Sequence, residues 1–166
     1  VVAWIEGPLA ADELDGHVRL TRSTPTAIAV GESIYSSRHF REYMQKGACS
    51  IGQVDVARIG GITPWLKVAH AAEAFDIPVC PHFLMELHVS LTCAVQNGRY
   101  VEYIPQLDDL TTKGMEIRDG HAIAPSEAGI GISWDWDAGR SRSVSEFTRE
   151  HVRSEWRSAR NREWAW

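Results

Sequence analysis

The chain has 166 residues, of which 44% are hydrophobic and 23% are charged, a composition typical of one folded domain with a hydrophobic core. No segment has the roughly 18 consecutive apolar residues of a membrane span, and no basic-then-apolar signal sequence begins the chain, so we expect a cytoplasmic protein with no membrane partner. The three cysteines, Cys49, Cys80 and Cys93, form no Cys-x-x-Cys pair, so we expect buried, reduced thiols rather than a disulfide framework or a cysteine zinc site.

The net charge of −5 is unevenly distributed along the chain. Residues 1–138 contain 10 Lys and Arg against 18 Asp and Glu, a net charge of −8, whereas residues 139–166 contain 7 Arg against 4 Glu, a net charge of +3. Nucleic-acid binding requires a basic face. The acidic first part therefore argues against nucleic acid as the main partner.

Short apolar segments alternate with longer segments of helical periodicity over the first hundred residues. Segments rich in Val, Ile and Ala predict buried strands at residues 1–5, 27–30, 51–56, 77–80 and 100–104. Between them, apolar residues at helical spacing predict helices at residues 12–21, 37–46, 63–75 and 85–95. Gly47 is a predicted C-cap, and Thr63 followed by Pro64 predicts the start of the third helix. This alternation predicts βα units around a parallel sheet.

The alternating pattern of apolar segments ends after residue 105. Asp119-Gly120 predicts a hairpin turn between strands at residues 115–118 and 121–124. From residue 139 onward the chain is rich in Arg, Ser and Trp. We therefore divide the chain into an α/β unit at residues 1–138 and a partly ordered tail at residues 139–166.

An ionisable residue lies at or near the end of each predicted strand. These residues are Glu6, Glu32, Asp55, His82 and Glu102, separated by 26, 23, 27 and 20 positions, each close to one βα repeat. Parallel α/β folds place their active sites at the carboxyl ends of the strands. We therefore expect these five side chains to converge on one site.

Each of these residues also has a structural interpretation when it is taken alone. A carboxylate at the start of a loop, such as Glu6, Glu32 or Glu102, is usually only solvated, and a buried histidine is most often a core residue with its hydrogen bonds made. The functional hypothesis depends on the complete set. Glu6 and Glu32 supply hard oxygen ligands suited to Mg²⁺, while Asp55 and His82 can form an acid–base dyad.

The order of these motifs resembles the C-terminal barrel half of the enolase superfamily and, within it, the mandelate racemase subgroup. The segments that carry the resemblance are Ile5-Glu6-Gly7-Pro8, Gly31-Glu32-Ser33, Asp55 with Arg58-Ile59-Gly60-Gly61-Ile62-Thr63, Pro81-His82-Phe83, and Val101-Glu102. The segments His82-Phe83-Leu84-Met85-Glu86-Leu87-His88 and Glu116-Ile117-Arg118-Asp119-Gly120 look most similar to acid-sugar dehydratases of the galactarate/talarate type.

This resemblance implies a partial (β/α) barrel of the TIM type, comprising about strands four to eight and lacking the first strands and the N-terminal capping domain. It implies that Glu6 and Glu32 are two of three Mg²⁺ ligands, and that Asp55 and His82 are the catalytic dyad on strands six and seven. Glu102, on strand eight, would hydrogen-bond a carboxylate oxygen of the substrate. The muconate-lactonising subgroup is disfavoured because it has a lysine where this chain has Asp55.

The implied activity is a Mg²⁺-dependent dehydration of an acid sugar, with proton abstraction next to a carboxylate, an enediolate and loss of water to a 2-keto-3-deoxy acid. One alternative is a racemase or epimerase of a 2-hydroxy acid that uses the same dyad. A second alternative is that the 166-residue chain is a non-catalytic truncated fragment or an interaction remnant. The resemblance also implies a small-molecule hydroxy-acid or acid-sugar partner and a homo-oligomer at full length.

Overall fold

A three-stranded parallel sheet lies at the centre of the fold. The computed structural model describes residues 2–142, so the expected tail lies outside the described residues from residue 143 onward. Strands β1 (Trp4–Glu6), β2 (Ala27–Val30) and β3 (Ile51–Gly52) pair in the order β1-β2-β3. All pairings are parallel, with Glu6 opposite Ala29 and Ala29 opposite Ile51. The predicted parallel arrangement of the first three strands is therefore confirmed, although β3 comprises only the first two residues of the strand expected at residues 51–56.

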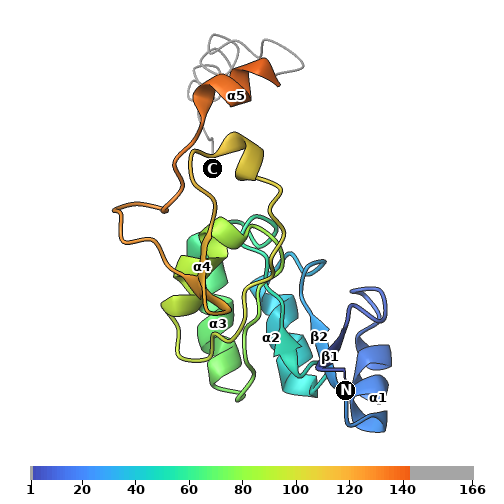
Figure 1. Ribbon diagram of the computed structural model, residues 1–166. Helices are drawn as coiled ribbons and strands as arrows, with labels where there is room; N and C mark the ends of the chain where they lie inside the picture. Colours follow the sequence, from blue (N-terminus) through green and yellow to red (C-terminus); the bar gives the residue numbers. More distant parts are fainter. Residues whose placement is uncertain (1, 143–166) are drawn as a thin grey trace, which may run out of the picture.

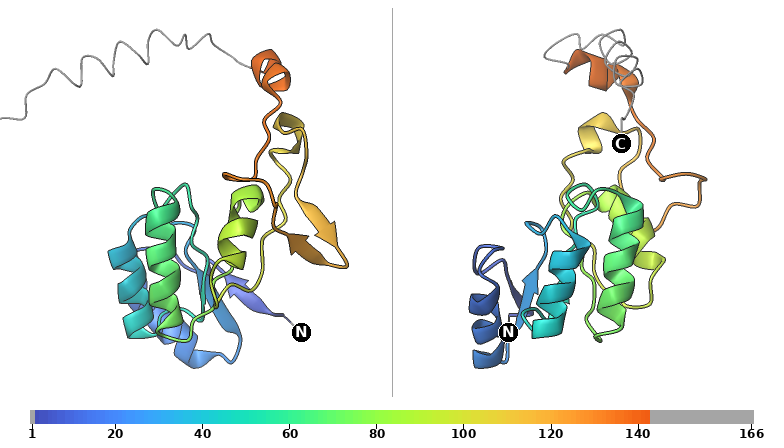
Figure 2. Two further views of the ribbon diagram at one scale, coloured as in Figure 1. Left: turned by 90° about the vertical axis from the view of Figure 1, so that its left-hand side faces the viewer. Right: turned by 180° about the vertical axis from the view of Figure 1, so that it is seen from behind.

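Three helices stand in a row in chain order on one side of the strands (Figures 1 and 2). They are α1 (Leu14–Ser23), α2 (Ser37–Lys46) and α3 (Ile62–Glu73), and a fourth helix, α4 (Met85–Cys93), follows the 77–80 segment. All four predicted helices are confirmed, with ends that differ by at most two residues from those expected and with α2 matching at both ends.

The ends of α2 and α3 show which capping predictions were correct. Gly47 is the left-handed C-cap of α2, at φ 65°, and its N–H donates to Met44 O at 3.1 Å. The prediction for α3 was wrong by two residues because Gly61, at φ 116°, is its N-cap and Thr63 already lies inside the helix. Only glycine adopts this backbone conformation readily, so the Gly60-Gly61 pair, rather than threonine, starts α3.

The core lies between the sheet and the row of helices. Ile28 of β2, Phe40 and Tyr43 of α2, and Trp65 of α3 are all fully buried. Burying a side chain of this size contributes about 1.5–3 kcal/mol to the free energy of unfolding. The loops at the carboxyl ends of the strands are therefore held on a packed support.

The expected fourth and fifth strands are not formed as regular strands. In the 77–80 segment, Val79 makes single parallel bridges to Gly52 and Gly98. Within residues 2–142, the pairing of the 77–80 segment with the chain after Gly98 ends at the hydrogen bond from Arg99 N–H to Val79 O, at 3.1 Å. The 100–104 segment is irregular, with Tyr100 exposed over 64% of its surface. Apolar composition alone therefore overestimated the strands, because a strand also requires a continuous ladder of backbone partners.

Part of the segment after residue 105 extends away from the sheet (Figure 2), whereas its hairpin lines a pocket together with Glu86 and Val89 of α4. The segment contains a 3₁₀ turn (Asp108–Leu110), the antiparallel hairpin of β4 (Glu116–Arg118) and β5 (His121–Ile123), and α5 (Trp136–Ser141). Asp119 and Gly120 have φ values of 51° and 77°, which confirms the predicted turn. Helix α5 crosses residue 138, where we expected the α/β unit to end. Within residues 2–142, no helix is long and apolar enough to cross a membrane.

Candidate active site

Glu6 and Glu32 lie at the carboxyl ends of two adjacent parallel strands. Glu6 is the last residue of β1, and Glu32 follows the end of β2 by two residues. Gly31 comes so close to the next loop that a Cβ atom there would lie 2.5 Å from the backbone carbon of Gln53. This close approach requires glycine and fixes the backbone from which the Glu32 carboxylate projects.

Asp55 lies in the loop that follows β3, and its side chain is 3% exposed. Its Oδ1 accepts hydrogen bonds from Ala57 N–H at 2.8 Å and Arg58 N–H at 3.1 Å, which closes a turn around the carboxylate. Just before it, the indole N–H of Trp65 donates to Val54 O at 3.1 Å. The loop is thus tied to α3, and Oδ2 is left to face His82.

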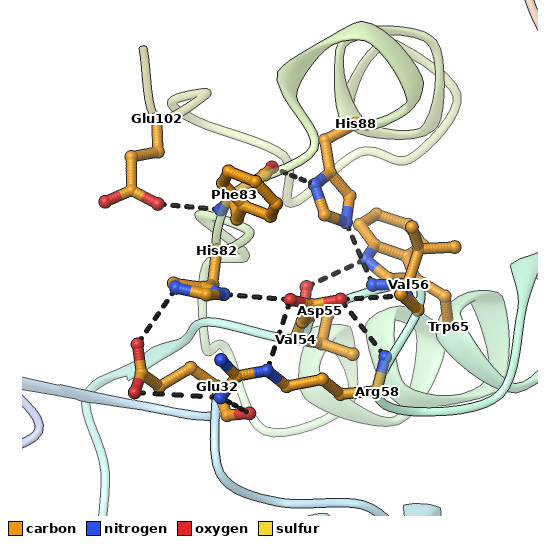
Figure 3. Close-up of polar contacts among 11 residues, drawn as sticks. Glu32, Val54, Asp55, Val56, Arg58, Trp65, His82, Phe83, His88 and Glu102 are labelled. Atoms are coloured by element: carbon orange, nitrogen blue, oxygen red, sulfur yellow. Dashed lines mark hydrogen bonds and ion pairs between the residues drawn. The ribbon is translucent and has the colours of Figure 1, made fainter. Parts of the chain in front are cut away.

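His82 lies between two carboxylates (Figure 3). Its Nδ1 is 2.9 Å from Asp55 Oδ2, and its Nε2 is 3.0 Å from Glu32 Oε2. With Nδ1 facing Asp55, the ring is held in one orientation, and Nε2 is directed at Glu32. The structure therefore brings three of the five predicted residues into one continuous network of hydrogen bonds and ion pairs.

The pKa of Asp55 is lowered from its ordinary value of 3.8. Burial raises the pKa of this carboxyl, but the hydrogen bond from His82 and the backbone N–H groups of Arg58 and Ala57 outweigh that effect. Asp55 is therefore an anion across the neutral pH range. A fixed anion beside Nδ1 orients the His82 ring and favours the tautomer that carries its proton on Nδ1.

Arg58 is a member of the network that the sequence analysis did not assign to the site. Its Nη1 donates to Glu32 O at 2.8 Å and lies 3.7 Å from Glu32 Oε1, while its Nε lies 3.7 Å from Asp55 Oδ2. A signal was present in the sequence, because Arg58 follows Asp55 by three residues in the same turn. The guanidinium balances the two carboxylates and connects the loops after β2 and β3.

Glu6 and Glu102 lie outside the His82 network within residues 2–142. Glu102 Oε2 accepts a hydrogen bond from Phe83 N–H at 2.7 Å, on the residue next to His82. Phe83 is in the left-handed region at φ 56°, an uncommon conformation for an aromatic residue. Glu102 thus supports the backbone beside the dyad, and its expected contact with a substrate carboxylate remains a prediction.

The donors at the carboxyl ends of β1 and β2 fit magnesium chemically. Mg²⁺ is commonly held by one or two carboxylates, with water and substrate completing the shell, and Glu6 and Glu32 are two such carboxylates on adjacent strand ends. Within the described chain, no group of three or more His, Cys, Asp or Glu side chains is arranged to hold a metal ion. The assignment of Glu6 and Glu32 as magnesium ligands therefore remains a prediction.

Parallel strands, a row of helices and a polar site at the strand ends are features of a (β/α)-barrel enzyme. The family model described as "Enolase C-terminal domain-like" matches residues 1–138. The chain therefore belongs to the enolase superfamily, and its relatives place it in the mandelate racemase subgroup.

The curated relatives include acid-sugar dehydratases. L-talarate/galactarate dehydratase of Salmonella typhimurium is 34% identical over 137 residues, which cover 82% of this chain and 34% of that protein. D-xylonate dehydratase of Haloferax volcanii is 30% identical over 156 residues, which cover 89% of this chain and 38% of that protein. The chain thus spans little more than a third of the length of these relatives.

The solved structures give the same fold. L-talarate dehydratase from Polaromonas sp. JS666, complexed with Mg and L-glucarate, is 36% identical, with a TM-score of 0.79 over 84% of this chain and 39% of that chain. A racemase from Streptomyces coelicolor A3(2) with bound magnesium is 31% identical, with a TM-score of 0.79 over 84% of this chain and 39% of that chain. The matched structures are barrels of the enolase C-terminal type, which supports a partial α/β barrel for this chain.

Proposed function

We propose that this chain contributes the His82–Asp55 dyad to a Mg²⁺-dependent acid-sugar dehydratase. The observation that carries the proposal is the position of His82 between Asp55 and Glu32, at 2.9 and 3.0 Å. A group that can transfer protons thus lies directly beside a candidate metal ligand. The dehydratases among the relatives, and the L-glucarate complex among the matched structures, support the choice of substrate class.

The proposed reaction removes the proton on the carbon next to the substrate carboxylate. The electrons of that C–H bond form an enediolate, which then expels the β-hydroxyl, and the resulting enol becomes a 2-keto-3-deoxy acid. Nε2 of His82 is the atom that takes the α-proton as a base or gives a proton to the departing hydroxyl as an acid. Asp55 holds Nδ1–H throughout and so keeps Nε2 as the reacting nitrogen.

Glu6 and Glu32 would hold the magnesium ion. When bound, Mg²⁺ supplies positive charge that stabilises the developing enediolate. Arg58 keeps the Glu32 backbone in place through its 2.8 Å hydrogen bond to Glu32 O. The position of the Glu32 carboxylate is then set by its fixed backbone rather than by free rotation of its flexible side chain.

Racemisation or epimerisation of a 2-hydroxy acid is the second candidate, because it shares the enediolate step and the same dyad. It is supported by the 31% identical racemase structure with bound magnesium. In this case a proton returns to the α-carbon on the opposite face and no hydroxyl leaves. The two candidates therefore differ in their products and not in their first step.

The test is incubation of the complete polypeptide that contains this chain, since the matched region spans 34% of the Salmonella enzyme. Mg²⁺ and galactarate or L-talarate are supplied in D₂O, and NMR follows the products. We expect a 2-keto-3-deoxy acid, lost in His82→Asn and retained in His70→Asn, a matched change of an exposed histidine on α3. Deuterium at the α-carbon with scrambled stereochemistry and no keto acid would favour the racemase and contradict the dehydratase.

A further inference from the structure

His88 contacts both loops that carry the dyad. Its Nε2 accepts a hydrogen bond from Val56 N–H at 3.1 Å, and its Nδ1 donates to Phe83 O at 2.5 Å. Val56 is the residue after Asp55, and Phe83 is the residue after His82. One imidazole therefore bridges the backbone on either side of the Asp55–His82 hydrogen bond (Figure 3).

The protonation state of His88 follows from these two contacts. The ring donates from Nδ1 and accepts at Nε2, so it is a neutral imidazole of defined tautomer. Its side chain is fully buried, and burial lowers the pKa of His88. A protonated His88 would place an N–H group at Nε2, opposite the N–H group of Val56, and no hydrogen bond could form there. The bridge between the two loops therefore requires the neutral ring, which burial favours.

The surroundings of His88 fix its ring in turn. Helix α4 begins directly after Leu84, which is left-handed at φ 34°, and His88 N–H bonds back to Leu84 O at 3.0 Å. The ring lies against the indole of Trp65, with centroids 6.2 Å apart. Trp65 itself donates to Val54 O, so α3 and α4 hold the backbone on both sides of the dyad aspartate.

Side chains also bind both backbone polar groups of Phe83. Glu102 accepts from Phe83 N–H at 2.7 Å, and His88 donates to Phe83 O. Phe83 and Leu84 have φ values of 56° and 34°, a conformation that non-glycine residues adopt at a cost of about 1–3 kcal/mol each. Such a loop keeps its shape only where the surrounding structure holds it, and this loop directs His82.

We propose that His88 is a positioning residue that sets the separation between Asp55 and His82 by binding the backbone beside each of them. The proposal deepens the proposed function, because it rests on the same dyad. Without His88, Val56 N–H and Phe83 C=O lose their partners, and the two loops are no longer connected through the core. The dyad then depends on its own 2.9 Å hydrogen bond to hold the loops together.

The test is proton NMR of the 166-residue chain, which needs neither substrate nor turnover. The signal to follow is the His82 Nδ1 proton, assigned by its loss in both His82→Asn and Asp55→Asn. In His88→Leu we expect the signal to disappear or to exchange with water at least about ten times faster. In His88→Gln we expect it to persist, because an amide presents one donor and one acceptor side by side, as a neutral imidazole does.

The matched control is Asn97→Leu. Asn97 Nδ2 also bridges two backbone segments, bonding Ala69 O at 3.0 Å and Ile77 O at 2.9 Å, but it lies at the opposite end of the 77–80 segment from His82. This variant loses a comparable bridge and should keep the His82 proton signal. The comparison separates a general loss of stability from a specific loss of the dyad geometry.

Folding of His88→Leu is checked by circular dichroism. If this variant does not fold, the comparison of His88→Gln with His88→Asn tests the proposal. The shorter asparagine side chain reaches Phe83 O but not Val56 N–H. His88→Asn should therefore lose the His82 proton signal that His88→Gln keeps. A folded His88→Leu chain with an unchanged His82 proton would overturn the proposal, as would a folded His88→Gln chain that loses it. Failure of the acid-sugar assay with an intact His88 effect would refute the dehydratase and leave the positioning role standing.

Discussion

Replacing Asp55 with asparagine removes the charge of the dyad while keeping the shape of its side chain. The amide oxygen of the asparagine can still accept from the N–H groups of Ala57 and Arg58, but its NH₂ group cannot accept the charge-assisted bond from His82 Nδ1. That bond contributes about 1.5–3 kcal/mol. The pair with Arg58, whose side chain is 36% exposed, is screened and contributes well under about 1 kcal/mol.

We therefore expect Asp55→Asn to lower the free energy of unfolding by about 2–3 kcal/mol near neutral pH. Urea unfolding followed by circular dichroism measures this as a midpoint shift of about 1–2 M. Asp15→Asn is the matched control, because Asp15 pairs with Lys46 at 3.4 Å while its side chain is 81% exposed. The control should shift the midpoint little, since exposed ion pairs contribute little stability.

The pH dependence gives the sign of the effect. The pKa of Asp55 is lower in the folded chain than in the unfolded chain, so its contribution is present above the ordinary value of 3.8 and is lost as the pH falls through the folded pKa. The difference in free energy of unfolding between the original chain and Asp55→Asn should persist at about pH 6 and shrink towards about pH 2.5. A difference below about 0.5 kcal/mol at neutral pH, or one that is unchanged in acid, would refute this explanation of the dyad.

Three further predictions concern the site and the core. Gly31→Ala should lower the free energy of unfolding by about 1–3 kcal/mol, because the new Cβ atom would lie 2.5 Å from the Gln53 backbone. Urea unfolding measures this change, and a change below about 0.5 kcal/mol would contradict the prediction. Glu32→Gln should weaken Mg²⁺ binding at least about tenfold in isothermal titration calorimetry, and equal affinity would rule Glu32 out as a ligand. Cys93 is exposed, so the expectation of three buried thiols was wrong for this residue. Cys93 should react quickly with iodoacetamide at about pH 8, whereas Cys49 should not, because burial raises the pKa of its thiol to about 12. Mass spectrometry identifies the labelled cysteine, and labelling of Cys49 in the folded chain contradicts the prediction.

Local patterns were enough to predict the helices and the hairpin. The apolar face of residues 37–46 and the following Gly47 depend only on nearby residues, and the structure has the same helix and the same left-handed cap. Asp119-Gly120 defines its turn through backbone conformation alone. Strands are less local, because Val79 forms only single bridges and the 100–104 segment forms none within the described residues. Whether an apolar segment becomes a strand depends on partners that are distant in sequence.

The candidate site likewise contains residues that local sequence patterns predict and residues whose roles depend on distant partners. The spacing of ionisable residues at strand ends led to Asp55, His82 and Glu32, which the structure joins in one network. Arg58 and His88 lie within the motifs of the resemblance but were given no role. Arg58 could have been recognised from its position three residues after Asp55, with which it pairs. Its bond to Glu32 O, and the bonds of His88 to Val56 N–H and Phe83 O, instead join loops that are distant in sequence. Contacts from a side chain to a distant backbone leave no pattern in the sequence. They become visible only when the loops are placed in space.

The proposed function depends most directly on His82, held by Asp55 beside Glu32, acting as an acid–base group on an acid sugar. The measurement that tests this is the rate of 2-keto-3-deoxy acid formation from galactarate or L-talarate by the complete polypeptide with Mg²⁺, compared with its His82→Asn variant. We expect product formation that falls by at least about a thousandfold in the variant, since the acid–base group is removed. Equal rates in the two proteins would contradict this role for His82.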